Sequence, residues 1–383
     1  MFRFLPLILK NCWRNRRRTL LTIASVSISM CLLGVMIAVF HGLYMSDPTP
    51  EEALRVVTRN KISLTQPLPQ SYGARIRQMP GVREVLISSW FGGTYKDPKN
   101  FFARFAVDSE KIFTIYSELR IPEDERRAFE RDRTGCAIGR DLANKYNLHV
   151  GDRLTLVGDI YPGDYDFTIR GIFDSPRASE IMYFSREYLE QTLEERRRGR
   201  AGTFVTLVDT PATATRIAKA IDDEYINSTA QTKTESEQAY LLGFVSLLGN
   251  VKMFLVAISA AIMFTILLVS ANTMAMSVRE RVREVGVLKT LGFTNGNVLG
   301  MILGEACAIS LLGGAIGFLV STVLTGGMRH SPVAGFLPPI APFDPAVAAV
   351  CIATAGAIGL MSSLVPALSA ARTSIVDALR STD

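Results

Sequence analysis

Cysteine and histidine are scarce in this chain, which has 5 Cys and 3 His among 383 residues. Cys136 is the only cysteine of the long polar segment after the first apolar run, so that segment cannot close an internal disulfide. The histidines, His41, His149 and His330, are far apart and lack the spacing of a metal site. No Ser/His/Asp or Cys/His arrangement stands out. We therefore expect no catalytic residues, no metal site and no enzymatic activity.

A phosphate-binding loop is also missing from the sequence. Such a loop has the pattern G-x-x-x-x-G-K-[ST], in which backbone N–H groups surround the phosphates. The Lys-Ser/Thr pairs of the chain are Lys233-Thr234 and Lys289-Thr290, and neither follows a glycine. We expect the chain to bind no cofactor, and any ATP hydrolysis to take place in a separate protein.

Charge is unevenly distributed along the chain. It is 48% hydrophobic and 20% charged, with a mean hydropathy of +0.21, which indicates apolar spans combined with a polar domain. The net charge of +6 could suggest a nucleic-acid partner, but a basic cluster without acidic residues precedes the first apolar run. Residues 1–18 are therefore typical of a cytoplasmic membrane flank, and no nucleic acid is expected. The basic residues of this flank are Arg3, Lys10, Arg14, Arg16, Arg17 and Arg18.

Four apolar runs are long enough to cross a bilayer, and only Glu305 interrupts one of them with a charge. One acid costs at most about 3 kcal/mol, which the surrounding Leu, Ile, Phe and Val residues outweigh. The Glu305 carboxylate is expected either to reach the membrane interface or to contact a neighbouring helix. The predicted spans are residues 19–46, the later part of 239–278, 298–326 and 345–371.

Glycines in the third span have small-xxx-small spacing, at 300 and 304 and again at 313 and 317. Such spacing lets two helix backbones approach closely. It indicates close packing within the chain, with a dimer interface as the alternative.

Basic residues in the short connections predict the orientation. The connection 279–297 carries Arg279, Arg281, Arg283 and Lys289, whereas the connection 327–344 has one basic residue and several prolines. Basic connections stay on the cytoplasmic side. Both termini, including the tail 372–383, and the connection 279–297 are therefore expected in the cytoplasm, and the segment 47–238 outside it. The length of the first apolar run favours an uncleaved anchor over a signal peptide.

The segment 47–238 has a mixed α and β pattern. Portions 50–95 and 201–232 each read as strand and helix, and they flank a β-rich insertion at about 96–200. Thr210 and Pro211 are typical of a helix start, and Thr234 with Glu237 of a capping box. From 239 to 278 we expect one continuous stalk and membrane helix. The predicted fold is an α-helical membrane protein with four transmembrane helices and a large α+β extracytoplasmic domain between the first and the second.

The connection after the second span has helical periodicity. Val278, Val282, Val285 and Leu288 share one face, and charged residues occupy the other. Gly292 is expected to end this helix. The pattern predicts a helix at the cytoplasmic interface, and by itself leaves open a plain membrane-surface helix without a partner.

The run 280–306, ERVREVGVLKTLGFTNGNVLGMILGEA, closely resembles the signature of MacB/FtsX-like ABC transporter permeases, a mechanotransmission group that includes the lipoprotein-releasing Lol permeases. The tail PALSAAR at 366–372 with VDALR at 376–380, and WRNRRRTLLT at 13–22, are similar to the ends of that family. The segment 139–156 resembles its extracytoplasmic core domain. The resemblance covers nearly the whole chain.

The resemblance implies two paired permease copies in a bacterial inner membrane, each receiving an ATPase that binds ATP and Mg²⁺ in the cytoplasm. The connection helix would be the coupling helix that docks on this ATPase. ATP-driven closure would then move the extracytoplasmic domains without passing substrate through the membrane. The positions that match the motif, and to which this coupling role is carried over, are Glu280, Arg283, Glu284, Gly286, Leu288, Lys289 and Gly292.

The resemblance leaves the task of such a transporter open. Efflux with a periplasmic adaptor and an outer-membrane channel, extraction of lipoproteins, and handling of membrane lipids all fit. The alternative is an FtsX-like regulatory scaffold that controls extracytoplasmic cell-wall hydrolases. The sequence names no cargo and does not distinguish a homodimer from a heterodimer.

Overall fold

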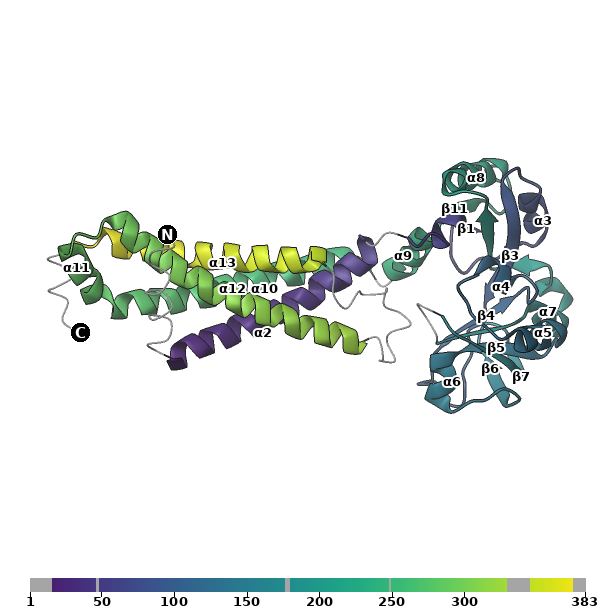
Figure 1. Cartoon of the computed structure of the whole chain (residues 1–383). Coiled ribbons are helices and arrows are strands. Elements are labelled where there is room, and N and C mark those ends of the chain that lie inside the picture. The colour runs from purple at the N-terminus through teal and green to yellow at the C-terminus, as the bar shows by residue number, and fades with distance from the viewer. Residues whose placement is uncertain (1–15, 46–47, 176–179, 248, 329–344, 375–383) are drawn as a thin grey trace. The chain divides into compact units, whose positions relative to one another are not determined.

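A computed structural model of the chain describes residues 16–45, 48–175, 180–247, 249–328 and 345–374. These residues form two compact units, and each is considered by itself. The first is a helical bundle, and the second is a large domain of residues 48–249 (Figure 1). Outside the described residues lie positions 1–15 of the expected flank 1–18, most of the connection 327–344 and the end of the tail.

The helical bundle contains four helices that are long and apolar enough to cross a membrane. This confirms the four predicted spans. Helix α12 packs against both α2 and α13, and side chains from all four helices form one apolar core. The helices are α2 (Arg16–Tyr44), α10 (Val251–Glu280), α12 (Asn295–Met328) and α13 (Pro345–Arg372).

Small residues let α12 approach its neighbours. Gly313 and Gly317 lie against α2, close to the side chain of Val26 and the backbone of Ser27. On the α13 side, Gly314 lies against Ala355. A side chain larger than hydrogen would hold these backbones apart. The glycine spacing at 313 and 317 therefore serves packing within the chain, as predicted.

The large domain is built on a nine-stranded sheet of order β11-β1-β10-β3-β4-β8-β5-β7-β6 (Figure 1). The pairs β4–β8 and β5–β7 are parallel, and the other neighbours are antiparallel. Strands β2 and β9 form a separate two-stranded sheet. The strands are β1 (Arg55–Asn60), β2 (Leu68–Pro69), β3 (Val82–Trp90), β4 (Ala103–Val107), β5 (Gly135–Gly139), β6 (Arg153–Gly158), β7 (Gly163–Phe173), β8 (Ile181–Ser185), β9 (Arg200–Ala201), β10 (Thr203–Val208) and β11 (Thr232–Ser236).

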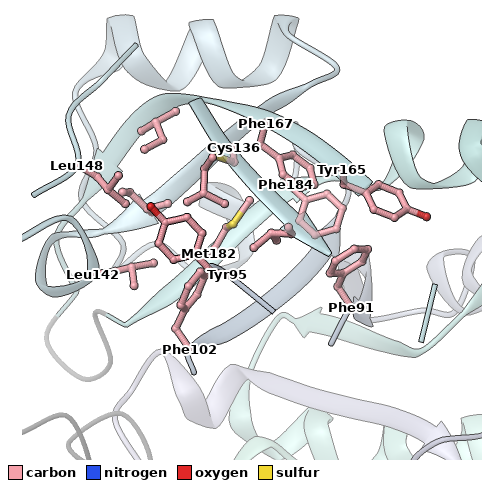
Figure 2. Close-up of a cluster of buried hydrophobic side chains, with 14 of the residues drawn as sticks. Phe91, Tyr95, Phe102, Cys136, Leu142, Leu148, Tyr165, Phe167, Met182 and Phe184 are labelled. Atoms are coloured by element: carbon pink, nitrogen blue, oxygen red, sulfur yellow. The ribbon is translucent and has the colours of Figure 1, made fainter. Parts of the chain in front are cut away.

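Helices cover both faces of the large sheet because its strands alternate apolar side chains between the two faces. Along β3, Val85 packs in a cluster with α3 and α8, while Leu86 packs in a cluster on the opposite face with α4 and α5. Along β8, Met182 and Phe184 join a third cluster, with Tyr183 opposite (Figure 2). The helices are α3 (Ser71–Arg77), α4 (Ile112–Ile115), α5 (Glu123–Arg131), α6 (Arg140–Tyr146), α7 (Arg186–Thr192), α8 (Pro211–Glu224) and α9 (Glu237–Leu247).

The segment expected as a β-rich insertion contributes β4 to β8 to the same sheet as the two flanking portions. The two parts of the sheet join at β3 and β4, and a Thr94–Val157 bridge and a shared apolar cluster also connect them. Strands β3 and β4 pair over only three residue pairs, Ser88–Val107, Ser89–Ala106 and Trp90–Phe105. We refer below to residues 103–185, the part of the predicted insertion 96–200 that contains β4 to β8, as the insertion.

Local start signals agree with the structure at α8 but not at α9. The Thr210 hydroxyl accepts from the Thr213 N–H at 3.3 Å, with Pro211 as the first helical residue, as predicted. The capping box of Thr234 and Glu237 was wrong, because Thr234 belongs to β11, where its hydroxyl pairs with that of Thr58. The hydroxyl that accepts from the first turn of α9 is that of Ser236.

The single helix expected from 239 to 278 was also wrong. Helix α9 ends at Leu247 and α10 begins at Val251. Between them Gly249 has a φ of +101°, a left-handed conformation that interrupts a right-handed helix. The Asn250 side chain then accepts from the Met253 N–H at 3.0 Å and starts α10.

Replacing Gly317 by leucine should separate α12 from α2. A β-carbon at Gly317 would lie 2.5 Å from the Ser27 carbonyl oxygen and 2.8 Å from the Met30 β-carbon. Overpacking of this kind costs about 1–3 kcal/mol, so the thermal unfolding temperature of the full chain in detergent should fall. Gly327→Leu is the matched control on the same helix, because nothing lies within 4 Å of its β-carbon position. Equal losses from both substitutions would contradict this packing.

Candidate functional site

Helix α11 (Val282–Thr290) is the connection helix predicted from the sequence. Arg281, with a φ of −112° and a ψ of 10°, lies between α10 and α11. The chain turns at this residue, and a new helix begins after it. At its end the Gly292 N–H donates to the Lys289 carbonyl and the Phe293 N–H to the Leu288 carbonyl. Gly292 has a φ of +91°, which only glycine adopts at little cost. The predicted helix end at Gly292 is confirmed.

The apolar face of α11 is turned toward the bundle. Val285 and Gly286 are buried, and Leu288 is half-buried. Val285 and Leu288 line a cavity of about 60 Å³ together with side chains of α10 and α12, including Met274 and Met301. The predicted amphipathic pattern therefore packs α11 on its own chain through one face.

An ion pair stands beside this cavity. An Arg281 guanidinium nitrogen, Nη1, lies 2.7 Å from Glu305 Oε2, and the two side chains are only 14% and 9% exposed. Glu305 also lines a second, smaller cavity, together with hydroxyl-bearing residues that include Thr19, Thr22 and Ser277. Of the two readings of Glu305, the contact with a neighbouring segment is the one that the structure supports. The pair joins the α10–α11 junction to α12.

Lys289 joins the other end of α11 to α13. Its Nζ donates to the carbonyl oxygens of Ala371 at 2.8 Å and Thr373 at 2.7 Å. These carbonyls lie at the C-terminal end of α13, where a cation also interacts favourably with the helix dipole. Within the chain, the charge of Lys289 therefore ties α11 to α13.

The other face of α11 is not covered by the rest of the chain. Arg283, Val287 and Leu291 follow one another at four-residue intervals and are all exposed, with Val287 at 50% and Leu291 at 72%. Glu280 is exposed at the preceding turn. Exposed large apolar side chains within a charged helix face are typical of docking positions. We refer to Arg283 and Val287 of α11, together with Glu280 at the end of α10 and Leu291 just after α11, as the outer face.

The predicted site residues are thus divided between two roles. Glu280 and Arg283 lie on the outer face, and Gly292 ends the helix. Glu284 and Leu288 line the inner cavity, Gly286 is buried and Lys289 binds α13. Sequence reasoning missed Val287 and Leu291, although their four-residue spacing from Arg283 could have revealed them. Within the part of the chain that the structure describes, no group of three His, Cys, Asp or Glu side chains could hold a metal ion.

Comparisons with known proteins agree along most of the chain. Residues 256–375 match the family described as FtsX-like permease C-terminal, and residues 19–224 match the MacB-like periplasmic core domain. An uncharacterized ABC transporter permease of Methanocaldococcus jannaschii is 24% identical over 336 residues, with 82% of each chain covered.

Two further similarities cover parts of the chain. A macrolide export ATP-binding/permease protein, MacB, of Sodalis glossinidius is 38% identical over 110 residues, which is 29% of this chain and 16% of that protein. The crystal structure of the periplasmic region of MacB from Actinobacillus actinomycetemcomitans is 9% identical with a TM-score of 0.35, covering 50% of this chain and 92% of that one. The similarity to the Sodalis protein thus spans about a sixth of its length.

Removing Arg281 alone should be more damaging than removing the whole ion pair. Arg281→Met leaves the Glu305 carboxylate buried without its cation, and breaking a buried pair costs about 3–5 kcal/mol. The double variant Arg281→Met/Glu305→Leu has no buried carboxylate without a cation, so it should regain most of the stability that Arg281→Met loses. Thermal unfolding of the full chain in lipid nanodiscs measures both effects. Additive losses in the double variant would show that the two side chains do not depend on each other.

Proposed function

Because this chain belongs to the MacB/FtsX-like family of ABC transporter permeases, we propose that it couples ATP hydrolysis by a separate ATPase to movement of its large domain. The observation that carries the proposal is the attachment of α11. Its start is tied to α12 through Arg281 and Glu305, and its end to α13 through Lys289. Since α11 also follows α10 directly, a force on α11 is transmitted to three membrane helices.

The orientation belongs to the same proposal. The connection that contains α11 carries Arg279, Arg281, Arg283 and Lys289, and basic connections remain in the cytoplasm. We place α11 and both termini on that side of the bacterial inner membrane, where ATP is found. The large domain is then in the periplasm or outside the cell, where it meets cargo.

The residues of α11 take different parts in the proposed coupling. Glu280 and Arg283 contact the ATPase together with Val287 and Leu291, because these four form the outer face. Glu284, Gly286, Leu288 and Lys289 act from inside by holding the helix on the bundle. Gly292 lets the chain turn into α12. ATP and Mg²⁺ are bound by the partner ATPase and not by these residues.

Pairing of two permease copies would complete the transporter. Helix α10 offers an apolar surface for such pairing or for membrane lipids, since only 17% of its most hydropathic stretch is buried in the bundle. Two copies would bring two α11 helices to the two subunits of an ATPase dimer. The exposed side chains of α10 include Phe254, Met263, Phe264, Leu268 and Met276.

We propose export as the task of the transporter, because two of its relatives are named a macrolide export and a pyoverdine export ATP-binding/permease protein. The large domain would work with a periplasmic adaptor, or act directly on a lipoprotein or lipid cargo. Affinity purification of the crosslinked chain from intact cells tests this task. An adaptor or an outer-membrane channel would support export, whereas a cell-wall hydrolase would support the FtsX-like scaffold instead.

Cysteine accessibility tests the orientation. Arg283 and Asp164 are both exposed, the first on α11 and the second on β7 of the large domain. In intact cells a membrane-impermeant maleimide should label Asp164→Cys, and should label Arg283→Cys only after the membrane is permeabilised. Labelling of both residues in intact cells would place α11 on the same side as the large domain and overturn the proposal.

An acidic residue on the outer face should release the ATPase. Val287→Asp or Leu291→Asp would bury a charge in the proposed interface, and loss of such an anchor costs about 2 kcal/mol or more, which is about thirtyfold in affinity. Co-purification of an ABC ATPase with the full chain in detergent measures the loss. Ile62→Asp is a matched control, since Ile62 is 80% exposed but lies in the large domain. Undiminished ATPase recovery with both outer-face variants would refute docking at this face.

A further inference from the structure

A buried arginine lies at the start of β1 in the large sheet. Arg55 is the first residue of β1, and its side chain is 2% exposed. Its Nε donates to Glu237 Oε2 at 2.7 Å, and its two terminal nitrogens donate to the Glu118 oxygens at 2.9 and 2.7 Å. The guanidinium also lies 4.5 Å from the centre of the Tyr116 ring. We call Arg55, Tyr116, Glu118 and Glu237 the Arg55 clamp.

The clamp joins three segments that are distant in the sequence. Arg55 opens the first strand after the membrane helix α2, and Glu237 opens α9, the last helix before α10. Glu118 belongs to the connector 108–121, which leads from β4 to α5 in the insertion. The Arg55 side chain therefore holds three segments together: the one that follows α2, the one that precedes α10, and the connector of the insertion.

The connector continues from the clamp into the body of the insertion. Its Arg120 exchanges two backbone hydrogen bonds with Asp174, at the end of β7, at 2.9 and 2.8 Å. Closer to β4, Lys111 donates to the Val85 carbonyl of β3 at 3.1 Å. A displacement at Arg55 thus has a hydrogen-bonded route to β7 that does not pass through the narrow β3–β4 pairing.

Opposite charges hold the Arg55 clamp together. Burial alone would lower the pKa of Arg55, but the carboxylates of Glu237 and Glu118 raise it above its ordinary value. Burial raises the pKa of Glu237, and the attraction of Arg55 opposes that rise. The cation thus compensates two largely buried carboxylates, and the fork of guanidinium N–H groups fixes their directions.

We infer that Arg55 is a positioning residue of the transporter, through which movement of the membrane-linked segments reaches the insertion. This inference rests on the proposed coupling of ATP hydrolysis to the large domain. Without the clamp, the remaining links, such as the β3–β4 pairs and the Thr94–Val157 bridge, would transmit the movement less directly, and the insertion would move less than the rest of the sheet. Arg55 acts through Glu118 and the connector and touches no substrate.

Spin labels on exposed positions test the inference in the full chain assembled with its co-purified ATPase. One pair joins Lys252→Cys on α10 to Asn144→Cys on α6 of the insertion, and the other joins Lys252→Cys to Lys219→Cys on α8. In the wild type, ATP with orthovanadate should shift both distance distributions. In Arg55→Lys, which keeps the charge but loses the two-pronged contact, the Asn144 shift should fall by more than half, while the Lys219 shift and ATP turnover persist.

Two matched variants separate coupling from general stability. Glu118→Gln keeps the shape of the side chain but removes its charge, and it should reproduce the effect of Arg55→Lys. Arg83→Lys alters an ion pair whose side chains are 54% and 51% exposed, and it should change neither distance shift. An unchanged Asn144 shift in both clamp variants overturns the role of Arg55 and leaves the proposed function intact. Equal loss of both shifts also overturns it, because the clamp would then be a general support. If neither pair responds in the wild type while ATP turns over, the proposed function itself fails.

Discussion

The contact of Glu305 with Arg281 sets where α11 can lie, because a cation stabilises a charged carboxylate that is buried between helices. The Arg281 backbone is the corner between α10 and α11, while Glu305 belongs to α12. One ion pair therefore fixes the corner, and Lys289 on the α13 carbonyls fixes the opposite end of the short helix. With both ends held, α11 has one face left for a partner, the face that carries Val287 and Leu291.

Two buried arginines of the large domain make different kinds of contact. Arg55 faces two carboxylates, and its pKa lies above the ordinary value. Arg104 is 1% exposed and donates to the backbone carbonyls of Gly93 and Asn100. Burial lowers the pKa of its guanidinium to about 10. The first arginine joins segments that are distant in the chain, and the second shapes a nearby loop.

Local sequence signals were dependable where no distant residue competes for them. Thr210 and Pro211 start α8 because the cap hydroxyl has only its own helix to bond. Thr234 has the same chemistry, but strand pairing places its hydroxyl against Thr58 and Asp222, and Ser236 takes over the cap. The expected helix through 239–278 failed at Gly249 because apolar composition alone does not reveal a left-handed residue.

The four membrane spans, the amphipathic helix between the second and third, and its end at Gly292 follow from the sequence alone. Hydrophobic run length, helical periodicity and glycine conformation are local properties. For an apolar run of about 20 residues, the free energy of transfer from water to lipid decides that the run spans the membrane. The partner of Glu305, the engagement of Lys289 with α13 and the meeting of Arg55 with Glu118 and Glu237 were decided by the tertiary structure. Each of these contacts joins residues far apart in the chain, and which charges meet depends on packing that no local pattern encodes.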